Sequence, residues 1–121
     1  MKKLTTLIML LLSISAFSQD PFFQKSNEQA EKEALEITNS YDLELSLTEK
    51  QELLFQRKVE EFLIRRYKIE AEISGKEKLD LLYGLQKQET AEMNDILTRP
   101  QMEVYKQVKP TIQPLETVAK E

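Results

Sequence analysis

Helix-breaking residues are scarce in this chain of 121 residues, which holds only two glycines and four prolines. No proline lies between Pro21 and Pro100, and 31% of all residues are charged. An all-β domain needs frequent Gly-rich turns, whereas long helices accept many charged residues on their solvent faces. The sequence therefore predicts an all-α protein, and its length is typical of one domain.

Two residue types that carry much catalytic and metal chemistry, Cys and His, do not occur in the chain. Their absence excludes disulfides, Cys or His zinc sites, cysteine nucleophiles and Ser-His-Asp triads. Carboxylate pairs such as Glu60 and Glu61 are common on solvated helix faces, and no Gly-rich phosphate loop accompanies them. We therefore expect no enzymatic activity, no catalytic or cofactor-binding residues, no metal site and no cofactor.

Residues 1–18 have the pattern of a secretory signal peptide. Lys2 and Lys3 precede a mainly apolar stretch over residues 4–17, and Ala16 and Ser18 offer small side chains at the positions needed for cleavage before Gln19. A membrane anchor is the alternative, but the apolar stretch is shorter than the ~20 residues that span a bilayer. We therefore expect a soluble periplasmic chain without stable membrane insertion.

The charge balance bears on the class of partner. After cleavage, 15 basic residues remain against 21 acidic residues, which gives a formal charge of −6. Proteins that bind nucleic acids are normally basic. Nucleic acid is therefore not an expected partner.

Capping and breaking residues divide the remaining chain into four expected helices, at about residues 27–41, 48–73, 76–96 and 100–109. Residues 19–25 are expected to form a flexible lead-in, residues 26–109 a helical domain, and residues 110–121 a flexible tail that begins where Pro110 ends the last helix. The second and third helices form one long hairpin, and shorter helices flank it. Gly75 is expected to take the left-handed conformation at the hairpin turn, and Ser74 with Glu77 to start the next helix. Gly84 marks either a close approach between helices or a weak point.

A five-residue pattern, Leu-Thr-x-x-Gln, occurs twice at the start of an expected helix. Its members are Leu47, Thr48 and Gln51 in the first copy, and Leu97, Thr98 and Gln101 in the second. Each copy predicts a capping box, in which the threonine hydroxyl accepts from an early helix amide and the glutamine side chain accepts from the amide of the threonine. In the second copy, Leu97 and Met102 also occupy the two positions of a hydrophobic staple.

Two copies of this motif, at the start of the long second helix and near the C-terminal end, resemble the Spy/CpxP family of periplasmic proteins, also called the LTxxQ-motif family. The resemblance covers about residues 26–109. It implies a four-helix chain that forms a cradle-like antiparallel homodimer and holds unfolded proteins without ATP. Some members also restrain an envelope-stress sensor kinase. The alternative is a chance recurrence of an efficient capping motif in an unrelated helical protein.

The chain departs from the family pattern in two respects. The client-binding faces of Spy-like cradles are basic, whereas this chain is net acidic, which leaves the range of clients open. Zinc-responsive relatives use His or Cys, both of which are absent here. A metal-sensing role is therefore not implied.

The expected second helix carries apolar side chains on two sides. Its main seam follows a period near 3.5 and is expected to pack against the first and third helices. The seam comprises Phe55, Val59, Phe62, Arg66, Ile69 and Ile73. Within this seam, Arg66 either lays its stem along the apolar surface and reaches solvent or a glutamate with its head, or makes a dimer contact.

The other side of the same helix forms a mixed ridge. Leu53, Arg57, Ile64, Lys68 and Ala71 fall within about 60° of one another, and Lys50 and Arg65 flank them. Apolar side chains interleaved with cations would hold unfolded segments loosely, because the cations attract acidic segments over a longer range. The ridge would serve equally well as a dimer seam, and both alternatives remain open.

Together these features predict a periplasmic, homodimeric, chaperone-like protein that holds unfolded or misfolded envelope proteins without ATP. Two alternatives remain. One is a regulatory ligand that binds the periplasmic domain of an envelope-stress sensor kinase. The other is a structural helical protein that binds no client.

Overall fold

The computed structural model describes residues 21–115, with side chains from residue 27 onward, and this part of the chain is all-helical. Its helices are α2 (Pro21–Leu45), α3 (Glu49–Glu72), α4 (Gly75–Met93) and α5 (Arg99–Ile112). The predicted all-α fold with four helices is confirmed for the described residues. The expected signal peptide and residues 116–121 of the expected tail lie outside them.

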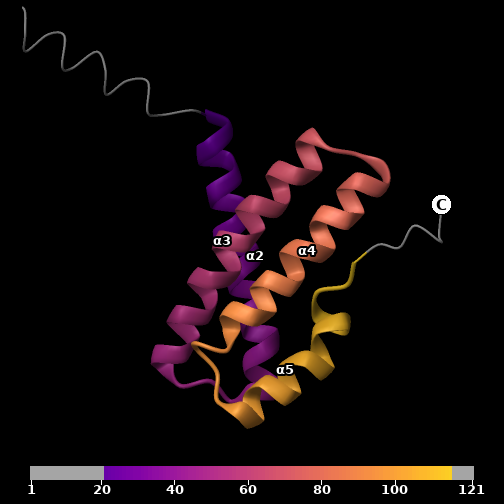
Figure 1. The fold of residues 1–121 in the computed structure, drawn as a ribbon. Helices are drawn as coiled ribbons and strands as arrows, with labels where there is room; N and C mark the ends of the chain where they lie inside the picture. The colour runs from indigo at the N-terminus through magenta and orange to yellow at the C-terminus, as the bar shows by residue number, and fades with distance from the viewer. Residues whose placement is uncertain (1–20, 116–121) are drawn as a thin grey trace, which may run out of the picture.

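The helices are arranged around the long α3–α4 hairpin. α3 and α4 run antiparallel in front of α2, and α5 lies at the end of the molecule opposite the hairpin turn (Figure 1). The principal packing pairs are α2 with α3, α3 with α4, and α2 with α5. The main core therefore forms where α2, α3 and α5 meet.

Three aromatic rings, one from each of these helices, occupy the centre of the core. The ring centroid of Tyr41 lies 5.1 Å from that of Phe55 and 5.0 Å from that of Tyr105. Phe55 and Tyr105 meet edge to face, with their centroids 5.9 Å apart. All three side chains are fully buried. Edge-to-face and offset rings at these distances attract beyond simple burial, so this cluster fixes the three helices together.

A smaller apolar group lies further along the hairpin. Phe62 of α3 and Leu79 and Leu82 of α4 are each at most 5% exposed, yet they do not belong to the main cluster. The predicted seam of α3 is therefore fully buried only over its first half, from Phe55 to Phe62. The later seam positions, from Arg66 to Ile73, are half-buried towards the hairpin turn.

α2 is longer than the sequence predicted, and the expectation that only shorter helices flank the hairpin is wrong for it, since α2 has 25 residues against 24 in α3 and 19 in α4. It begins at Pro21, so residues 21–25, expected as a flexible lead-in, are helical, and it ends at Leu45 rather than near Tyr41. Proline is tolerated in a first turn because the missing amide hydrogen would have had no helical partner. At the other end, Leu45 is 6% exposed and joins the main core, so its burial stabilises the additional turn.

The hairpin turn agrees with the prediction at Gly75 and differs at Ser74. Gly75 has a φ of +68°, in the left-handed region that favours glycine. Ser74 is the N-cap residue of α4, but its side chain makes no capping hydrogen bond. The expected pairing of Ser74 with Glu77 is therefore not formed. The turn combines extended backbone at Ile73 and Ser74 with the left-handed conformation of Gly75.

Spacings of four and three residues in the sequence predict a packing stripe on the third helix, made of Leu79, Tyr83, Gln86, Thr90, Met93 and Leu97. The buried face of α4 is rotated relative to the middle of this stripe. Leu82 and Glu89 are buried, whereas Tyr83, which the stripe included, is 43% exposed. The helix also ends at Met93, and residues 94–96 form a turn instead of continuing to Ile96. Gly84 is exposed, and an added Cβ there would meet nothing within 4 Å. It is therefore a weak point and not a close approach between helices.

α5 continues past Pro110, which was expected to end it. The helix runs to Ile112, and the amide of Gln113 donates to the carbonyl of Lys109 at 2.7 Å. Pro110 removes one hydrogen bond of the last turn. Beyond the proline, however, Ile112 packs against the core and Gln113 is only 8% exposed. Burial of these two residues keeps the start of the expected tail in place.

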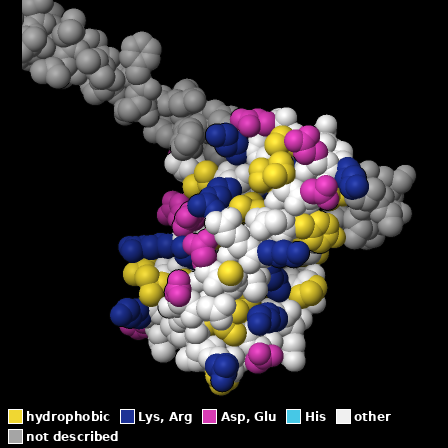
Figure 2. Space-filling view, in the orientation of Figure 1, with side chains coloured by type: hydrophobic (Ala, Val, Ile, Leu, Met, Phe, Trp, Pro, Cys, Tyr) yellow, Lys and Arg dark blue, Asp and Glu magenta, His cyan; other side chains and the backbone are white. Residues whose placement is uncertain are grey.

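The surface mixes charge types. On the face seen in Figure 2, yellow hydrophobic, dark blue basic and magenta acidic side chains are interspersed over α3 and α4. Several large apolar side chains in the described part of the chain remain exposed. They are Leu35, Leu43, Leu53, Leu54, Leu81 and Tyr83.

Candidate functional site

Both predicted capping boxes are present. The hydroxyl of Thr48 accepts from the amide of Gln51 at 3.1 Å, and the amide of Thr48 donates to Oε1 of Gln51 at 3.1 Å. In the second copy, the corresponding distances between Thr98 and Gln101 are 3.4 Å and 2.9 Å. Thr48 and Thr98 therefore act as N-caps of α3 and α5.

The two copies also bond to each other, which the sequence analysis did not foresee. Nε2 of Gln51 donates to Oε1 of Gln101 at 2.8 Å, and Nε2 of Gln101 donates to Oε1 of Gln51 at 3.1 Å. The second hydrogen of each amide is also used, because Gln51 donates to the carbonyl of Ile96 at 3.1 Å and Gln101 to that of Leu45 at 3.2 Å. This glutamine pair joins the starts of α3 and α5, fifty positions apart.

The sequence did contain a signal for this pair. A capping box uses only the side-chain oxygen of its glutamine, so each motif leaves two amide hydrogens free. When their helices begin side by side, two partly buried glutamines can each donate a free amide hydrogen to the side-chain oxygen of the other. The leucines that precede the caps contribute by packing, since Leu97 is 7% exposed in the core and Leu47 packs against it.

A buried polar network ties α4 to α5. Nζ of Lys109 donates to Oε1 of Glu89 at 2.8 Å and to the hydroxyl of Tyr105 at 2.7 Å. The side chains of the ion pair are only 8% and 4% exposed. Beside the pair, Oε1 of Gln113 accepts from the hydroxyl of Tyr41 at 2.7 Å, and its amide donates to Glu89 at 3.4 Å.

Burial shapes the ionisation of this network. Loss of solvation lowers the pKa of Lys109, although Glu89 opposes that effect. Loss of solvation, followed by the negative charge of Glu89, raises the pKa of Tyr41 and of Tyr105. Because the Lys109 amine already donates to Glu89 and Tyr105, the pair acts as an electrostatic connection between helices.

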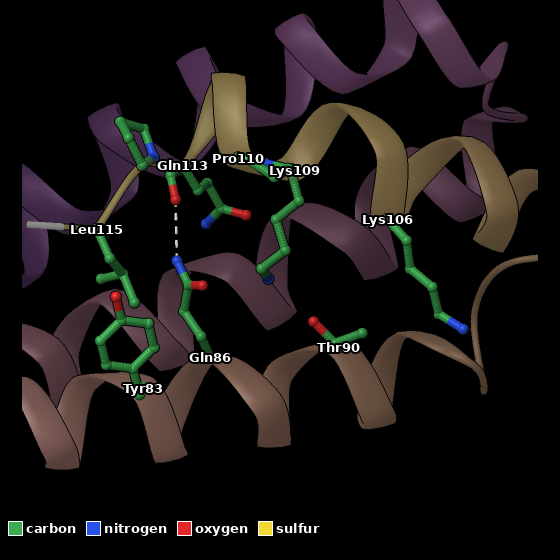
Figure 3. A pocket seen from close by; sticks show the side chains of 9 residues that line it. Tyr83, Gln86, Thr90, Lys106, Lys109, Pro110, Gln113 and Leu115 are labelled. Carbon is green, nitrogen blue, oxygen red and sulfur yellow. Dashed lines mark hydrogen bonds between the residues drawn. The ribbon is translucent and has the colours of Figure 1, made fainter. Parts of the chain in front are cut away.

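A groove opens next to the network, between α4 and α5. Its volume is about 420 Å³, and Tyr83, Gln86 and Thr90 line its α4 wall. Figure 3 shows Lys109 reaching from α5 toward α4, while Gln86 donates across the groove to the carbonyl of Gln113 at 2.9 Å. This site could not be predicted from the sequence, because an isolated glutamate and lysine resemble ordinary solvated helix residues.

The predicted mixed ridge of α3 is only partly an open surface. Leu53 is 52% exposed, and Arg57 and Lys68 are exposed as predicted. Ile64, by contrast, is half-buried and packs against the main core. Arg65 is turned aside, with its guanidinium carbon 4.9 Å from the ring centroid of Phe62. Ile64 is therefore not a free member of the ridge.

Beside the ridge, the structure adds an apolar residue that the sequence analysis had passed over. Leu54 is 37% exposed. It lines a shallow hollow of about 360 Å³ between α3 and α4, together with Arg57, Ile96 and four charged residues. The exposed region therefore consists of the paired leucines Leu53 and Leu54 with the cations around them. We call Leu53, Leu54 and Arg57 the outer face of α3.

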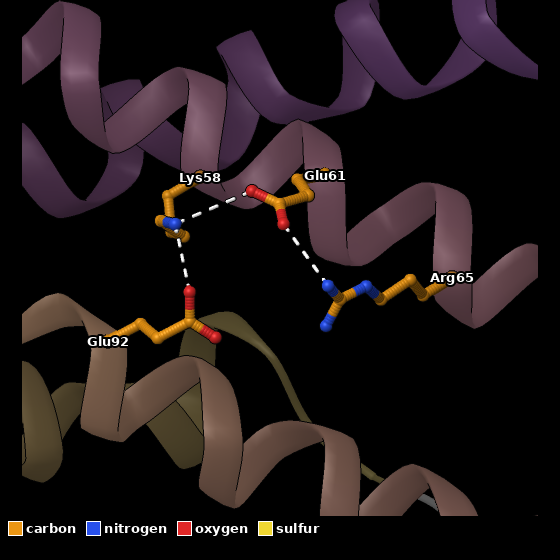
Figure 4. Close-up of polar contacts among 4 residues, drawn as sticks. All are labelled: Lys58, Glu61, Arg65 and Glu92. Atoms are coloured by element: carbon orange, nitrogen blue, oxygen red, sulfur yellow. Dashed lines mark hydrogen bonds and ion pairs between the residues drawn. The ribbon is translucent and has the colours of Figure 1, made fainter.

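Ion pairs frame this hollow. Nζ of Lys58 lies 2.9 Å from Glu92 of α4 and 3.4 Å from Glu61, and Arg65 lies 3.2 Å from Glu61 (Figure 4). The hydrogen bond between Lys58 and Glu92 raises the pKa of the lysine and lowers that of the glutamate. Lys58 and Arg65 are thus held in place by carboxylates.

Arg66 follows one of the two predicted alternatives. Its side chain is 31% exposed, and Nε lies 3.3 Å from Glu70 one turn further along α3. The stem therefore lies along the seam, and the charged head reaches a glutamate at the edge of the seam.

Two searches for sites concern the described residues alone. Between residues 21 and 115, acidic side chains do not gather into groups of three or more that could hold a metal ion. None of the helices described there is long and apolar enough to cross a membrane. Comparison of the chain with family models, with curated proteins and with solved structures found no match.

Proposed function

We propose that the chain is an ATP-independent, chaperone-like protein of the cell envelope that holds unfolded or misfolded proteins, and that it acts as a homodimer in the periplasm. The observation that supports this proposal best is the outer face of α3. Leu53 and Leu54 are 52% and 37% exposed beside Arg57. Exposed apolar side chains that neighbour one another are typical of interaction surfaces.

The size of this surface favours weak and general binding. Full burial of a leucine contributes roughly 1.5–3 kcal/mol, so completing the burial of Leu53 and Leu54, which are 52% and 37% exposed, contributes about 0.5–1.5 kcal/mol each. Binding of that strength releases a client readily. The adjacent cations extend the reach of the surface, because they attract acidic segments of a client before contact.

The paired charges beside the hollow also suit a single complementary partner. Lys58, Glu61, Arg65 and Glu92 hold fixed positions through ion pairs. A regulatory ligand of a sensor kinase would use such a pattern for recognition, because charge arrangement favours specificity over affinity. This function is the second candidate.

The test is suppression of aggregation of a chemically denatured client in the absence of ATP. Leu53→Asp is expected to reduce protection several-fold, because it replaces apolar contact area by a charge. Leu43→Asp is the matched control, since Leu43 is 87% exposed on another helix. Equal protection by the two variants would remove the outer face of α3 from the binding surface.

Assembly is measured on the same samples. Light scattering is expected to give the mass of a dimer for the purified chain. If Leu53→Asp yields monomers and keeps full protection, the outer face of α3 is the dimer interface. Tight one-to-one binding to a sensor domain, without protection of clients, would favour the regulatory function.

A further inference from the structure

The chain segment after α5 forms part of the wall of several hollows. We call Gln113, Pro114 and Leu115 the strap. On one side of the strap lies the groove between α4 and α5. On its other side lies a second hollow of about 540 Å³, which α2 and the end of α5 line. The strap thus runs between two open spaces.

Apolar side chains of the hairpin lie beneath the strap. A small hollow of about 20 Å³ separates Leu115 and Gln113 from Phe62, Leu63 and Leu82. Each of these three hairpin residues is at most 5% exposed. Phe62 and Leu82 belong to the smaller apolar group outside the main core. Departure of the strap would therefore expose apolar surface without taking the aromatic cluster apart.

The contacts that hold the strap are mainly polar. Gln113 bonds to Tyr41 at 2.7 Å and to Glu89 at 3.4 Å through its side chain, and its carbonyl accepts from Gln86 at 2.9 Å. Pro114 is exposed and Leu115 is half-exposed. The bonds to Tyr41 and from Gln86 join neutral groups and contribute only modestly to stability, because water replaces them when the strap leaves. The bond to the Glu89 carboxylate is long, at 3.4 Å. The strap is thus fastened more weakly than the core beside it.

We propose that the strap is a displaceable cover over Phe62, Leu63 and Leu82, and that the groove it leaves beside α4 receives an extended, proline- and leucine-containing segment of another polypeptide. The strap itself indicates this chemistry. Its non-helical backbone presents a carbonyl to Gln86, and its leucine lines the hollow over Phe62 and Leu82. A foreign segment that makes the same contacts competes directly with it.

The test uses the full chain and a labelled peptide that copies residues 111–115. Gln113→Ala combined with Leu115→Ser weakens the strap and leaves the groove intact. It is expected to bind the peptide at least about tenfold more tightly than the wild type, because two hydrogen bonds and an apolar contact no longer hold the competitor. Gln107→Ala, on the exposed side of α5, is the matched control and is expected to match the wild type.

Two further samples test specificity. Adding Gln86→Ala to the weakened strap removes the donor to the peptide carbonyl, and the gain in affinity is expected to fall. A peptide in which the proline and the leucine are both replaced by serine is expected not to bind. If the variant with the weakened strap binds the original peptide no more tightly than the wild type does, and keeps its helicity, the proposal is overturned. New dimers of this variant would also overturn it, because the occupant would then be the strap of a second copy.

Amide hydrogen exchange of the wild type tests the strap without substitution. The amide of Gln113, which donates to Lys109, is expected to be at least tenfold less protected than that of Tyr105 in the core. Equal protection would mean that the strap does not open separately, which contradicts the proposal. These results are independent of aggregation assays, so failure of the strap and failure of the holding function can be distinguished.

Discussion

The reciprocal pair of Gln51 and Gln101 allows a quantitative prediction. Each side chain makes four hydrogen bonds: two within the pair, one with the amide of its own threonine, and one to a backbone carbonyl. That carbonyl belongs to Ile96, in the turn before α5, for Gln51, and to Leu45, at the end of α2, for Gln101. A net contribution of about 0.5–1.5 kcal/mol per hydrogen bond, with water replacing some of them, predicts a loss of about 2–4 kcal/mol for either Gln→Ala variant.

The double variant is the informative one. Each single variant breaks the two bonds of the pair, so the double variant loses six bonds where the two singles together lose eight. The coupling free energy is therefore expected to equal the two shared bonds, about 1–3 kcal/mol. The loss in the double variant falls short of the sum of the single losses by that amount.

Urea unfolding followed by circular dichroism measures these differences. Gln107→Ala corrects for the higher helix propensity of alanine, because Gln107 is exposed on α5. Unchanged m values are required for the comparison. Additivity of the two substitutions within about 0.3–0.5 kcal/mol would refute the reasoning and reduce the motifs to independent caps.

Further substitutions test separate parts of the fold by the same unfolding assay. Thr48→Ala and Thr98→Ala are each expected to cost about 1 kcal/mol, and the corresponding Ser variants less; a change only in client binding would contradict a capping role. Gly84→Ala is expected to stabilise the fold by about 0.5–1 kcal/mol, since nothing crowds the new methyl group; a loss of stability would reveal a contact at that position. Lys109→Met leaves Glu89 buried without its partner and is expected to cost about 3–5 kcal/mol, most of which Glu89→Leu in the same chain restores. Because burial lowers the pKa of Lys109, the folded chain releases this proton at a lower pH than the unfolded chain, in which the pKa is the ordinary 10.5. Between these two pKa values the unfolded chain binds more protons, so the stability of the wild type relative to Lys109→Met should rise with pH over that window. A difference between the two proteins that does not change with pH would contradict this assignment.

Capping chemistry predicted the helix starts well, because it depends on a few neighbouring residues. Thr48 and Thr98 begin α3 and α5 where the motif places them, and Gly75 turns the hairpin with a positive φ. The helix ends were harder to predict. Burial of Leu45 and of Gln113 extends α2 and α5 beyond the expected stops, and burial depends on the whole fold.

The features of the candidate sites were less predictable for the same reason. The stripe expected on α4 included Tyr83 and left out Glu89. From the sequence alone, a glutamate is expected to face solvent, and only the fold shows that Lys109 of another helix pairs with it. Ile64 seemed to lie on an open ridge, but α3 packs against α2 through more than one narrow seam, and the core covers part of Ile64. Periodicity identifies the faces of a helix. It does not identify which partner covers each face.

The central claim, that the chain holds unfolded proteins through the outer face of α3, is tested most directly by aggregation of a chemically denatured client. Several unrelated clients are diluted into buffer without ATP, with the wild-type chain at equal and excess molar ratios. We expect the delay and amplitude of light scattering to change with chain concentration for most clients. We also expect Leu53→Asp to weaken this protection and Leu43→Asp to preserve it. Absence of protection by the wild type for every client would contradict the claim and favour the regulatory alternative.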